Sequence, residues 1–290
     1  MEYRRLGRTG LKVSELCLGT MTFRWTSTEE QSLQVLDRAF DAGINFIDTA
    51  DVYSFWADDN DGGVSEAIIG QWMQGKPREQ IVLATKVRGR MWDGPNGEGL
   101  SRGHIMQAVE DSLRRLQTDY IDLYQIHGWD STTPLEETLR TLDDMVRQGK
   151  VRHIGLSNYM AWQAAIALGI QARDRLESYS TAQMYYSLVG RGLEHEWLSF
   201  AEYTGMGILV WSPLAGGFLS GKYSRNEPVP AGTRFHDAGQ FVPFDYDKGY
   251  AVIDVLREVA AAHDTSPAQV ALAWLLLTRV VFRLPNQSID

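Results

Sequence analysis

The chain has 290 residues, of which 44% are hydrophobic and 22% charged, which describes a globular protein with a large core. Its net charge of -9 disfavours nucleic acid and anionic membranes as partners, because both attract clustered Lys and Arg. The single cysteine, Cys17, cannot form an internal disulfide. No signal-peptide core and no run of about 20 apolar residues is present, so we expect a cytoplasmic protein that does not span a membrane.

Short β-rich apolar runs alternate with helical periodicity along the chain, a pattern typical of a parallel sheet. We expect strands over residues 15–18, 44–48, 81–85, 120–126, 151–156, 181–185, 208–211 and 280–284. No linker separates the two halves, and α/β barrels of about 250 residues form one domain. The sequence therefore predicts a single (β/α)8 TIM barrel over residues 1–290, with a small hairpin (3–6 and 12–13) at its floor.

Helix boundaries have their own signals. Capping boxes are expected at Thr28, Thr133 and Ser266, and helix stops at Gly43, Gly75 and Gly149. Residues 213–247 form a long Gly- and Pro-rich stretch after the seventh expected strand. Long loops at the carboxyl ends of barrel strands are usually functional, so we expect a lid.

Four polar residues follow three consecutive strands: Asp48, Tyr53, Lys86 and His127. Each residue taken alone more often has a structural role. An Asp after a strand usually belongs to a turn, a loop Tyr usually lies on the surface, a Lys at a strand end usually extends into solvent, and a buried His is usually hydrogen-bonded within the core. Together they should converge on one rim of a barrel. There Lys86 would lower the pKa of Tyr53, Asp48 would keep Lys86 charged, and His127 would donate a hydrogen bond to a carbonyl oxygen. Tyr53 would then supply a proton.

These segments, together with residues 18–21, 65–70, 119–127 and 149–158, make the chain similar to the aldo-keto reductase family, in particular its bacterial and channel β-subunit-like branch. The resemblance implies that Asp48, Tyr53, Lys86 and His127 are the catalytic tetrad. It also implies reversible reduction of an aldehyde or ketone to an alcohol, with hydride from a nicotinamide, usually NADPH, with NADH as the alternative.

The same matching implies a cofactor site. Ser157, Asn158 and Gln183 would hold the carboxamide, and Trp211 would stack on the nicotinamide. The alternative for Trp211 is a structural role in the core of the barrel. The pyrophosphate loop would contain Ser212, Pro213, Leu214, Gly217 and Lys222. The alternative for Lys222 is a solvent-exposed lysine of the lid with no ligand. Gly19, Thr20 and Met21 complete the expected cofactor-binding residues.

Four tryptophans each follow one of the first four strands and are candidates for a substrate pocket: Trp25, Trp56, Trp92 and Trp129. If they line it, the small-molecule carbonyl substrate has an apolar or aromatic body, whereas the alternative is plain loop packing. The six histidines are scattered, so we expect no metal site.

The C-terminal region departs from the family. Residues 280–287 do not reproduce the Gly and Arg motif that grips the adenosine phosphate, so no residue is assigned to it and NADPH preference is left open. The final helix and tail also have no counterpart, so we expect reduced stability or a partner over the gap.

Two rival functions remain beside an active reductase: a non-catalytic, nicotinamide-sensing regulatory subunit, and a barrel inactivated by C-terminal truncation. Aldehyde turnover at enzymatic rates would exclude both. The physiological substrate and the oligomeric state, including a homo-oligomer, are open.

Overall fold

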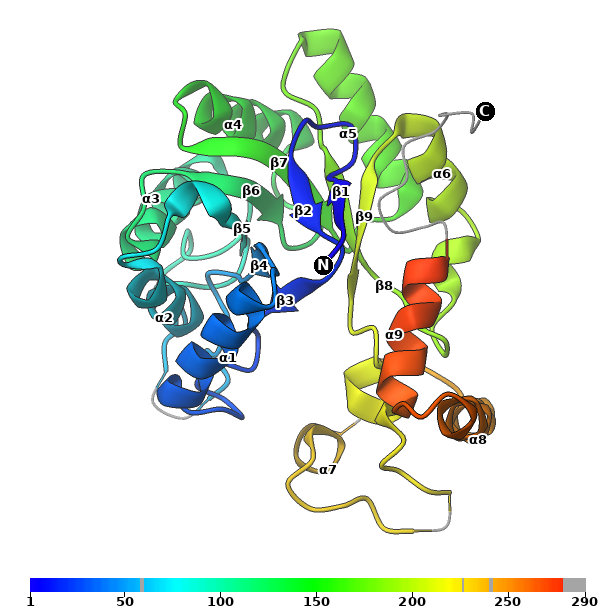
Figure 1. Ribbon diagram of the computed structural model, residues 1–290. Helices are drawn as coiled ribbons and strands as arrows, with labels where there is room; N and C mark the ends of the chain where they lie inside the picture. Colours follow the sequence, from blue (N-terminus) through cyan, green and yellow to red (C-terminus); the bar gives the residue numbers. More distant parts are fainter. Residues whose placement is uncertain (58–59, 226, 240–241, 279–290) are drawn as a thin grey trace. The chain divides into compact units, whose positions relative to one another are not determined.

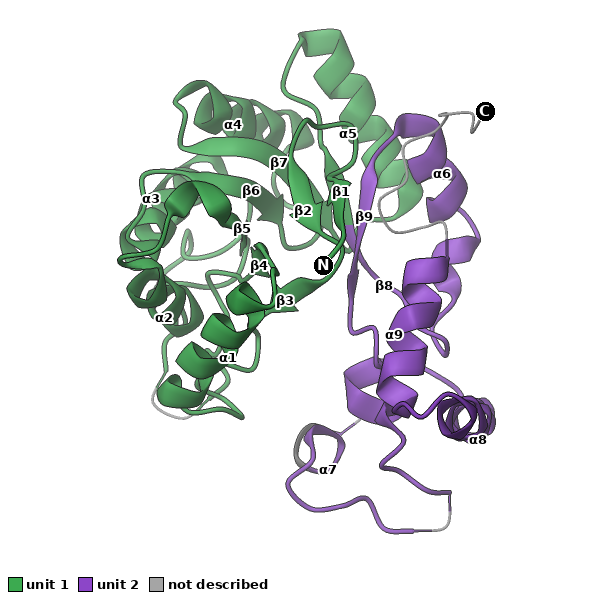
Figure 2. Ribbon diagram, in the orientation of Figure 1, with its two compact units in different colours: residues 1–182 green, residues 183–290 purple. Residues whose placement is uncertain are grey.

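The computed structural model describes residues 1–57, 60–225, 227–239 and 242–278 (Figure 1). The chain forms two compact units, Met1–Ala182 and Gln183–Asp290, coloured separately in Figure 2. Each unit is described by itself, and the expected single domain stays a prediction.

Unit 1 alternates strands and helices along the chain. Its elements are β1 (Tyr3–Arg5), β2 (Lys12–Ser14), β3 (Cys17–Gly19), α1 (Glu29–Asp41), β4 (Phe46–Asp48), α2 (Val64–Met73), the 3-10 helix η1 (Arg78–Gln80), β5 (Val82–Val87), α3 (Arg102–Leu116), β6 (Ile121–Ile126), α4 (Leu135–Arg147), β7 (Val151–Ser157), α5 (Ala161–Asp174) and the start of β8 (Thr181–Tyr185). Strands β3 to β7 lie side by side in chain order, and the pairs from β3–β4 to β6–β7 are parallel. This is the strand and helix order of a (β/α)8 barrel, and it confirms the α/β class.

The strands agree with the sequence patterns, and the end of no described strand is shifted by more than two residues. Central strands β4, β5 and β6 are buried at every position, because helices cover the outer face while the inner face forms the core. Their register places Asp48 beside Ala84, and Lys86 beside Gln125. Cross-strand neighbours share a face, so these polar side chains project from the same face of the sheet. The eighth expected strand, 280–284, lies outside the described residues.

Two of the three expected capping boxes are confirmed. Thr28 caps α1 with Gln31, and Ser266 caps the last described helix with Gln269. The third expectation was wrong: α4 begins at Leu135 with Pro134 as its N-cap. The Thr133 hydroxyl donates instead to Asp130 Oδ2 at 2.7 Å, which removes it from capping.

The N-terminal hairpin is confirmed, since β1 and β2 pair antiparallel. Asn45, which directly precedes β4, ties the hairpin to the sheet: its Oδ1 accepts from Ser14 N at 2.7 Å, and its Nδ2 donates to Lys12 O at 3.2 Å. The hairpin thus lies at the amino end of β4, opposite the end that carries Asp48.

A partly buried ion pair connects α2 and α3 to the strand that carries Lys86. Glu66 Oε2 accepts from Arg115 Nε at 2.7 Å, and its Oε1 accepts from the Thr85 hydroxyl at 2.5 Å. The two helices approach closely at Gly70, where a Cβ would lie 2.2 Å from Arg115 O. Only glycine fits there, so α2 and α3 pack backbone to backbone at this point.

Unit 2 contains the remainder of β8 and the neighbouring strand β9 (Gly207–Trp211). Its other elements are η2 (Gly192–Glu194), α6 (Trp197–Thr204), η3 (Ala215–Ser220), α7 (Arg234–Ala238), α8 (Tyr246–Ala262) and α9 (Pro267–Leu277). The expected lid, 213–247, is therefore not a plain loop. Phe218, Leu219, Tyr223 and Val242 are buried in a hydrophobic cluster with α8 and α9, so much of the stretch is packed structure.

The described part of the chain has neither a membrane-spanning helix nor a metal-binding cluster. None of its helices has both the length and the apolar character that a membrane crossing needs. None of its His, Cys, Asp and Glu side chains gather in threes or more at a spacing that could hold a metal ion.

Candidate active site

The ammonium of Lys86 is the centre of the candidate site. Lys86 is the fifth residue of β5 and its side chain is fully buried. Its Nζ donates to Asp48 Oδ1 at 2.5 Å, to Thr49 O at 2.8 Å and to Tyr53 OH at 3.0 Å. Burial lowers the pKa of Lys86, but Asp48 and then Tyr53 raise it more, so the pKa lies above its usual value. Lys86 stays charged, as expected.

The second oxygen of Asp48 has its own donor. Gln125 Nε2 donates to Asp48 Oδ2 at 3.1 Å, and Gln125 is fully buried. Two donors on two oxygens hold the carboxylate plane against Lys86. We did not predict this role from the sequence, although Gln125 lies two residues before His127 and the twofold repeat of a strand places both on one face.

The expected effect of Lys86 on the pKa of Tyr53 is corrected by the structure. Burial raises the pKa of Tyr53, and this effect exceeds the lowering by Lys86, so the pKa lies above its ordinary value. Only 8% of Tyr53 is exposed, which explains why the effect of desolvation on its pKa exceeds that of Lys86. The hydroxyl is therefore protonated near neutral pH and can act as a proton donor.

His127 lies beside Tyr53, with the two ring centroids 5.8 Å apart. Burial lowers the pKa of His127, and Lys86 and Arg88 lower it further, to about 3. The imidazole is therefore neutral and carries one N–H, as a hydrogen-bond donor to a carbonyl requires. Asn158 Nδ2 donates to the backbone oxygen of His127 at 3.0 Å, which connects the ends of β6 and β7.

The depressed pKa of His127 predicts a pH effect. Its NMR resonance should not titrate between pH 5 and 9. An unfolded His binds a proton near pH 6.5 whereas folded His127 does not, so the stability it contributes is present above pH 6.5 and is lost as pH falls toward 3. In urea unfolding at pH 7 and pH 5, His127→Gln should therefore lose less stability on acidification than the wild type. A His127 titration near pH 6.5 would contradict this.

The four candidate tryptophans fall into three groups. Trp25 and Trp56 pack together at 5.6 Å between ring centroids, and Trp56 lies 6.1 Å from the Tyr53 ring. Trp129 packs on Tyr159 at 5.1 Å. Trp92 lies on His104, 4.6 Å away. Trp56 thus packs against a tetrad residue, Tyr53, and the pocket role of all four tryptophans stays a prediction.

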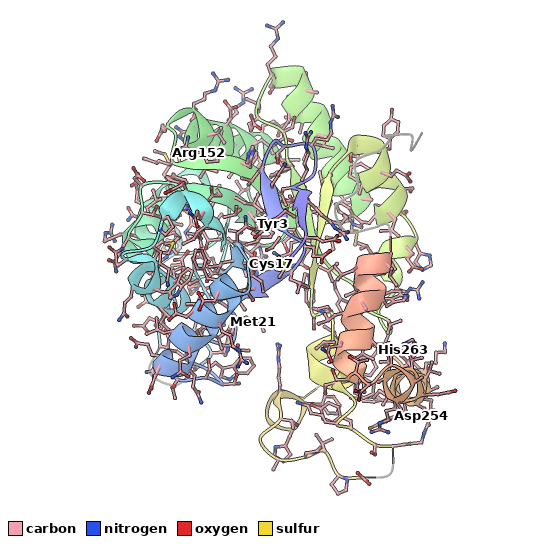
Figure 3. The ribbon with its side chains drawn as sticks, viewed as in Figure 1. Tyr3, Cys17, Met21, Arg152, Asp254 and His263 are labelled. Carbon is pink, nitrogen blue, oxygen red and sulfur yellow. The ribbon has the colours of Figure 1, made fainter. Side chains whose placement is uncertain are left out.

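The cofactor candidates in unit 1 follow β3 and β7. Gly19 ends β3, and Thr20 and Met21 come next; Met21 and the strand's first residue, Cys17, are labelled in Figure 3. Thr20 is buried and its hydroxyl donates to Asp48 O at 3.0 Å, so it also supports the strand that carries Asp48. Ser157 is buried, and Asn158 has a left-handed φ of 57°.

The cofactor candidates in unit 2 lie on β8 and β9 and in the segment that runs from β9 through η3 to Lys222. Gln183 is buried, and Trp211 packs on Tyr185 with 5.1 Å between ring centroids. The loop of Ser212, Pro213 and Leu214 leads to Gly217, where a Cβ would meet only Lys222 Nζ, 3.9 Å away. A backbone free of side chains next to an exposed ammonium fits a pyrophosphate. A nicotinamide dinucleotide is therefore compatible with the residues present.

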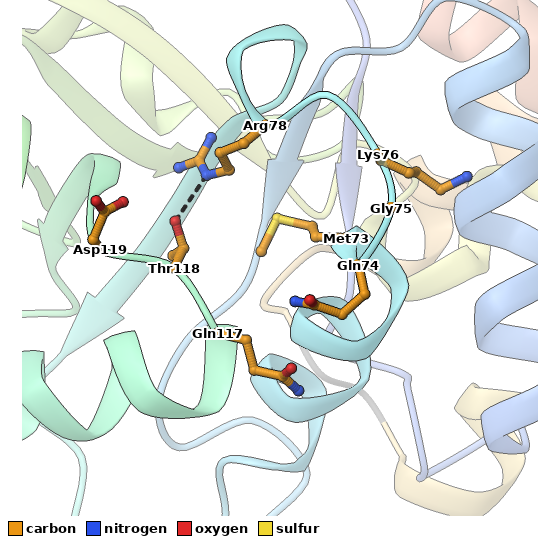
Figure 4. Close-up of a pocket in the computed structure, with 8 residues that line it drawn as sticks. All are labelled: Met73, Gln74, Gly75, Lys76, Arg78, Gln117, Thr118 and Asp119. Atoms are coloured by element: carbon orange, nitrogen blue, oxygen red, sulfur yellow. Dashed lines mark hydrogen bonds between the residues drawn. The ribbon is translucent and has the colours of Figure 1, made fainter.

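A hollow of about 440 Å3 lies elsewhere in unit 1 and is shown in Figure 4. It is lined by Met73, Gln74, Gly75, Lys76, Arg78, Gln117, Thr118 and Asp119. These residues precede β5 and β6, at the amino ends of the strands and away from the tetrad. Arg78 uses its N–H groups on Thr118, Ile81 O, Tyr120 O and Asp122. This hollow therefore carries none of the candidate chemistry.

Comparison with known proteins gives the class of protein. The aldo/keto reductase family model matches residues 15–288. The chain is 41% identical to the uncharacterized oxidoreductase YrpG of Bacillus subtilis over 287 residues, which cover 97% of this chain and 85% of YrpG. It is 36% identical to versiconal hemiacetal acetate reductase of Aspergillus parasiticus over 95% of this chain and 85% of that protein. A probable voltage-gated potassium channel subunit beta of Oryza sativa subsp. japonica is 35% identical over 94% of this chain and 83% of its own.

The chain therefore belongs to the aldo/keto reductase family. This confirms the resemblance drawn from its motifs, and membership supports an oxidoreductase acting on carbonyl compounds.

Proposed function

We propose that the protein reduces aldehydes or ketones to alcohols, reversibly, with Tyr53 as the proton donor. One observation carries this proposal: a single buried ammonium, Lys86 Nζ, bonds both the Asp48 carboxylate and the Tyr53 hydroxyl, at 2.5 Å and 3.0 Å. A bound nicotinamide would supply hydride to the carbonyl carbon.

The side chains divide the remaining work. His127, neutral and beside Tyr53, would donate a hydrogen bond to the carbonyl oxygen as negative charge develops there. Tyr53 would then transfer its proton to that oxygen. The tyrosinate left behind would lie next to Lys86 Nζ, whose positive charge Asp48 maintains. A protonated Tyr53, a charged Lys86 and a neutral His127 each support reduction.

The cofactor we propose is NADPH, with NADH as the alternative. Ser157, Asn158 and Gln183 would hold the carboxamide, Trp211 would stack on the nicotinamide, and Lys222 would pair with the pyrophosphate beside Gly217. We further propose a cytoplasmic enzyme with a small carbonyl substrate and no nucleic acid or membrane partner.

The test begins with intrinsic tryptophan fluorescence, titrated with NADPH and separately with NADH. Saturable quenching by either, followed by oxidation of the reduced cofactor with an aldehyde at about 1 s⁻¹ or faster, is the expected result. Trp211→Phe should reduce the quench, and Trp197→Phe, a buried change on α6, is its control. Binding without turnover would favour the nicotinamide-sensing subunit instead. Absence of binding would contradict the proposed function.

A further inference from the structure

The rim of unit 1 carries a cation outside the tetrad. Arg88 follows β5 directly and lies two residues after Lys86. Within unit 1, the residues proposed for the cofactor lie at the ends of β3 and β7, so the ends of β5 and β6 remain for the substrate. Arg88 is therefore placed where a substrate group beyond the carbonyl would lie.

The backbone and side chain of Arg88 are both held in place. Its φ is 146°, which is uncommon for a residue with a side chain, and its carbonyl accepts from Gly99 N at 3.0 Å. Its Nε donates to Trp129 O at 3.1 Å. The side chain lies against Gly128, where a Cβ would be 3.7 Å from Arg88 Cδ. An unusual backbone at a rim that carries candidate chemistry is a pointer to function.

The guanidinium of Arg88 differs from its neighbours in charge pairing. Arg78 and Arg90 form ion pairs with Asp122 and Glu98, whereas no carboxylate of the described residues pairs with Arg88. Asp130, close in sequence to Trp129, accepts instead from Leu100 N, Thr132 and Thr133. Arg88 is exposed, so its terminal N–H groups can bind an anion from solution.

The backbone of Trp129 binds this cation, and the Trp129 ring belongs to a group of aromatic side chains. Trp129, whose carbonyl binds Arg88, has its ring 5.1 Å from Tyr159 and 6.1 Å from Trp162. Trp162 and Met160 are exposed by 53% and 62%, which is unusual for such large apolar side chains. The rim after β6 and β7 thus offers an apolar face next to a positive charge.

We propose that Arg88 binds a carboxylate of the substrate, and that the enzyme prefers aldehydes or ketones that join a carboxylate to an aromatic or apolar body. This inference rests on the proposed function. A guanidinium binds a carboxylate with two parallel hydrogen bonds, and a cation in a protein of net charge -9 attracts an anionic substrate locally.

The test compares 4-formylbenzoate with its uncharged methyl ester in steady-state kinetics. Arg88→Met should lower the ratio of kcat/KM for acid over ester by about tenfold, mainly through KM, and leave the ester within about twofold. Arg88→Lys should retain part of the preference. The control is Arg175→Met, an exposed arginine that also has a positive φ, at the end of α5, and it should leave the ratio unchanged.

Calorimetric titration with 4-(hydroxymethyl)benzoate gives a readout independent of turnover: binding to the wild type and about tenfold weaker binding to Arg88→Met is expected. An unchanged ratio and unchanged binding in Arg88→Met would overturn the inference, even if both aldehydes are reduced. Reduction of neither aldehyde would count against the proposed function, and the calorimetry would still decide whether Arg88 binds the carboxylate.

Discussion

Replacing Tyr53 by phenylalanine is expected to lower kcat for carbonyl reduction by about 10²- to 10⁴-fold, the range for loss of a general acid. The hydroxyl contributes one of three hydrogen bonds to Lys86 Nζ, and the ammonium keeps Asp48 and Thr49 O without it. The fold and the affinity for NADPH should therefore change little. Stopped-flow measurement of hydride transfer, alongside fluorescence titration of the cofactor, separates the two effects.

Tyr124→Phe is the matched control. Tyr124 is fully buried on β6, and its hydroxyl has no hydrogen-bond partner among the described residues. Its removal should leave kcat unchanged and cost no hydrogen bond. If Tyr53→Phe kept a tenth or more of the wild-type kcat while Tyr124→Phe behaved as expected, another group would have to donate the proton.

Lys86→Met should combine the loss of activity with a loss of stability of about 3–5 kcal/mol, because removing one partner of a buried ion pair leaves the other charge unpaired. Asp48 is 7% exposed and would keep the Gln125 hydrogen bond but lose the ammonium of Lys86. The double variant Lys86→Met/Asp48→Asn should recover much of the stability and none of the activity. Urea unfolding monitored by circular dichroism measures the first, and the aldehyde assay the second.

Lys76→Met serves as the control for the ion pair. Lys76 pairs with Asp37 at 2.8 Å, but the Asp37 side chain is 55% exposed, so the substitution should cost less than about 1 kcal/mol. Equal stability losses in the two Lys variants, or a double variant no more stable than Lys86→Met, would show that the buried pair does not stabilise the fold as described.

Some features of the fold followed from local sequence patterns alone. The apolar runs located the described strands to within two residues, and the boxes at Thr28 and Ser266 located two helix starts, because both signals arise from neighbours in the chain. The box expected at Thr133 failed because a residue outside the pattern, Asp130, binds that hydroxyl. The packing of the 213–247 stretch likewise depends on α8 and α9, which lie later in the chain.

By itself, the sequence determined the family and the convergence of Asp48, Tyr53, Lys86 and His127, because the carboxyl ends of consecutive parallel strands meet at one rim. Only the tertiary structure decided the protonation states there. Burial raises the pKa of Tyr53 by more than Lys86 lowers it, and burial also lowers the pKa of His127. Desolvation depends on every atom packed around a group, which the sequence does not show. That no carboxylate of the described residues pairs with Arg88 was decided in the same way, since pairing requires a carboxylate close in space, and sequence spacing does not measure that distance.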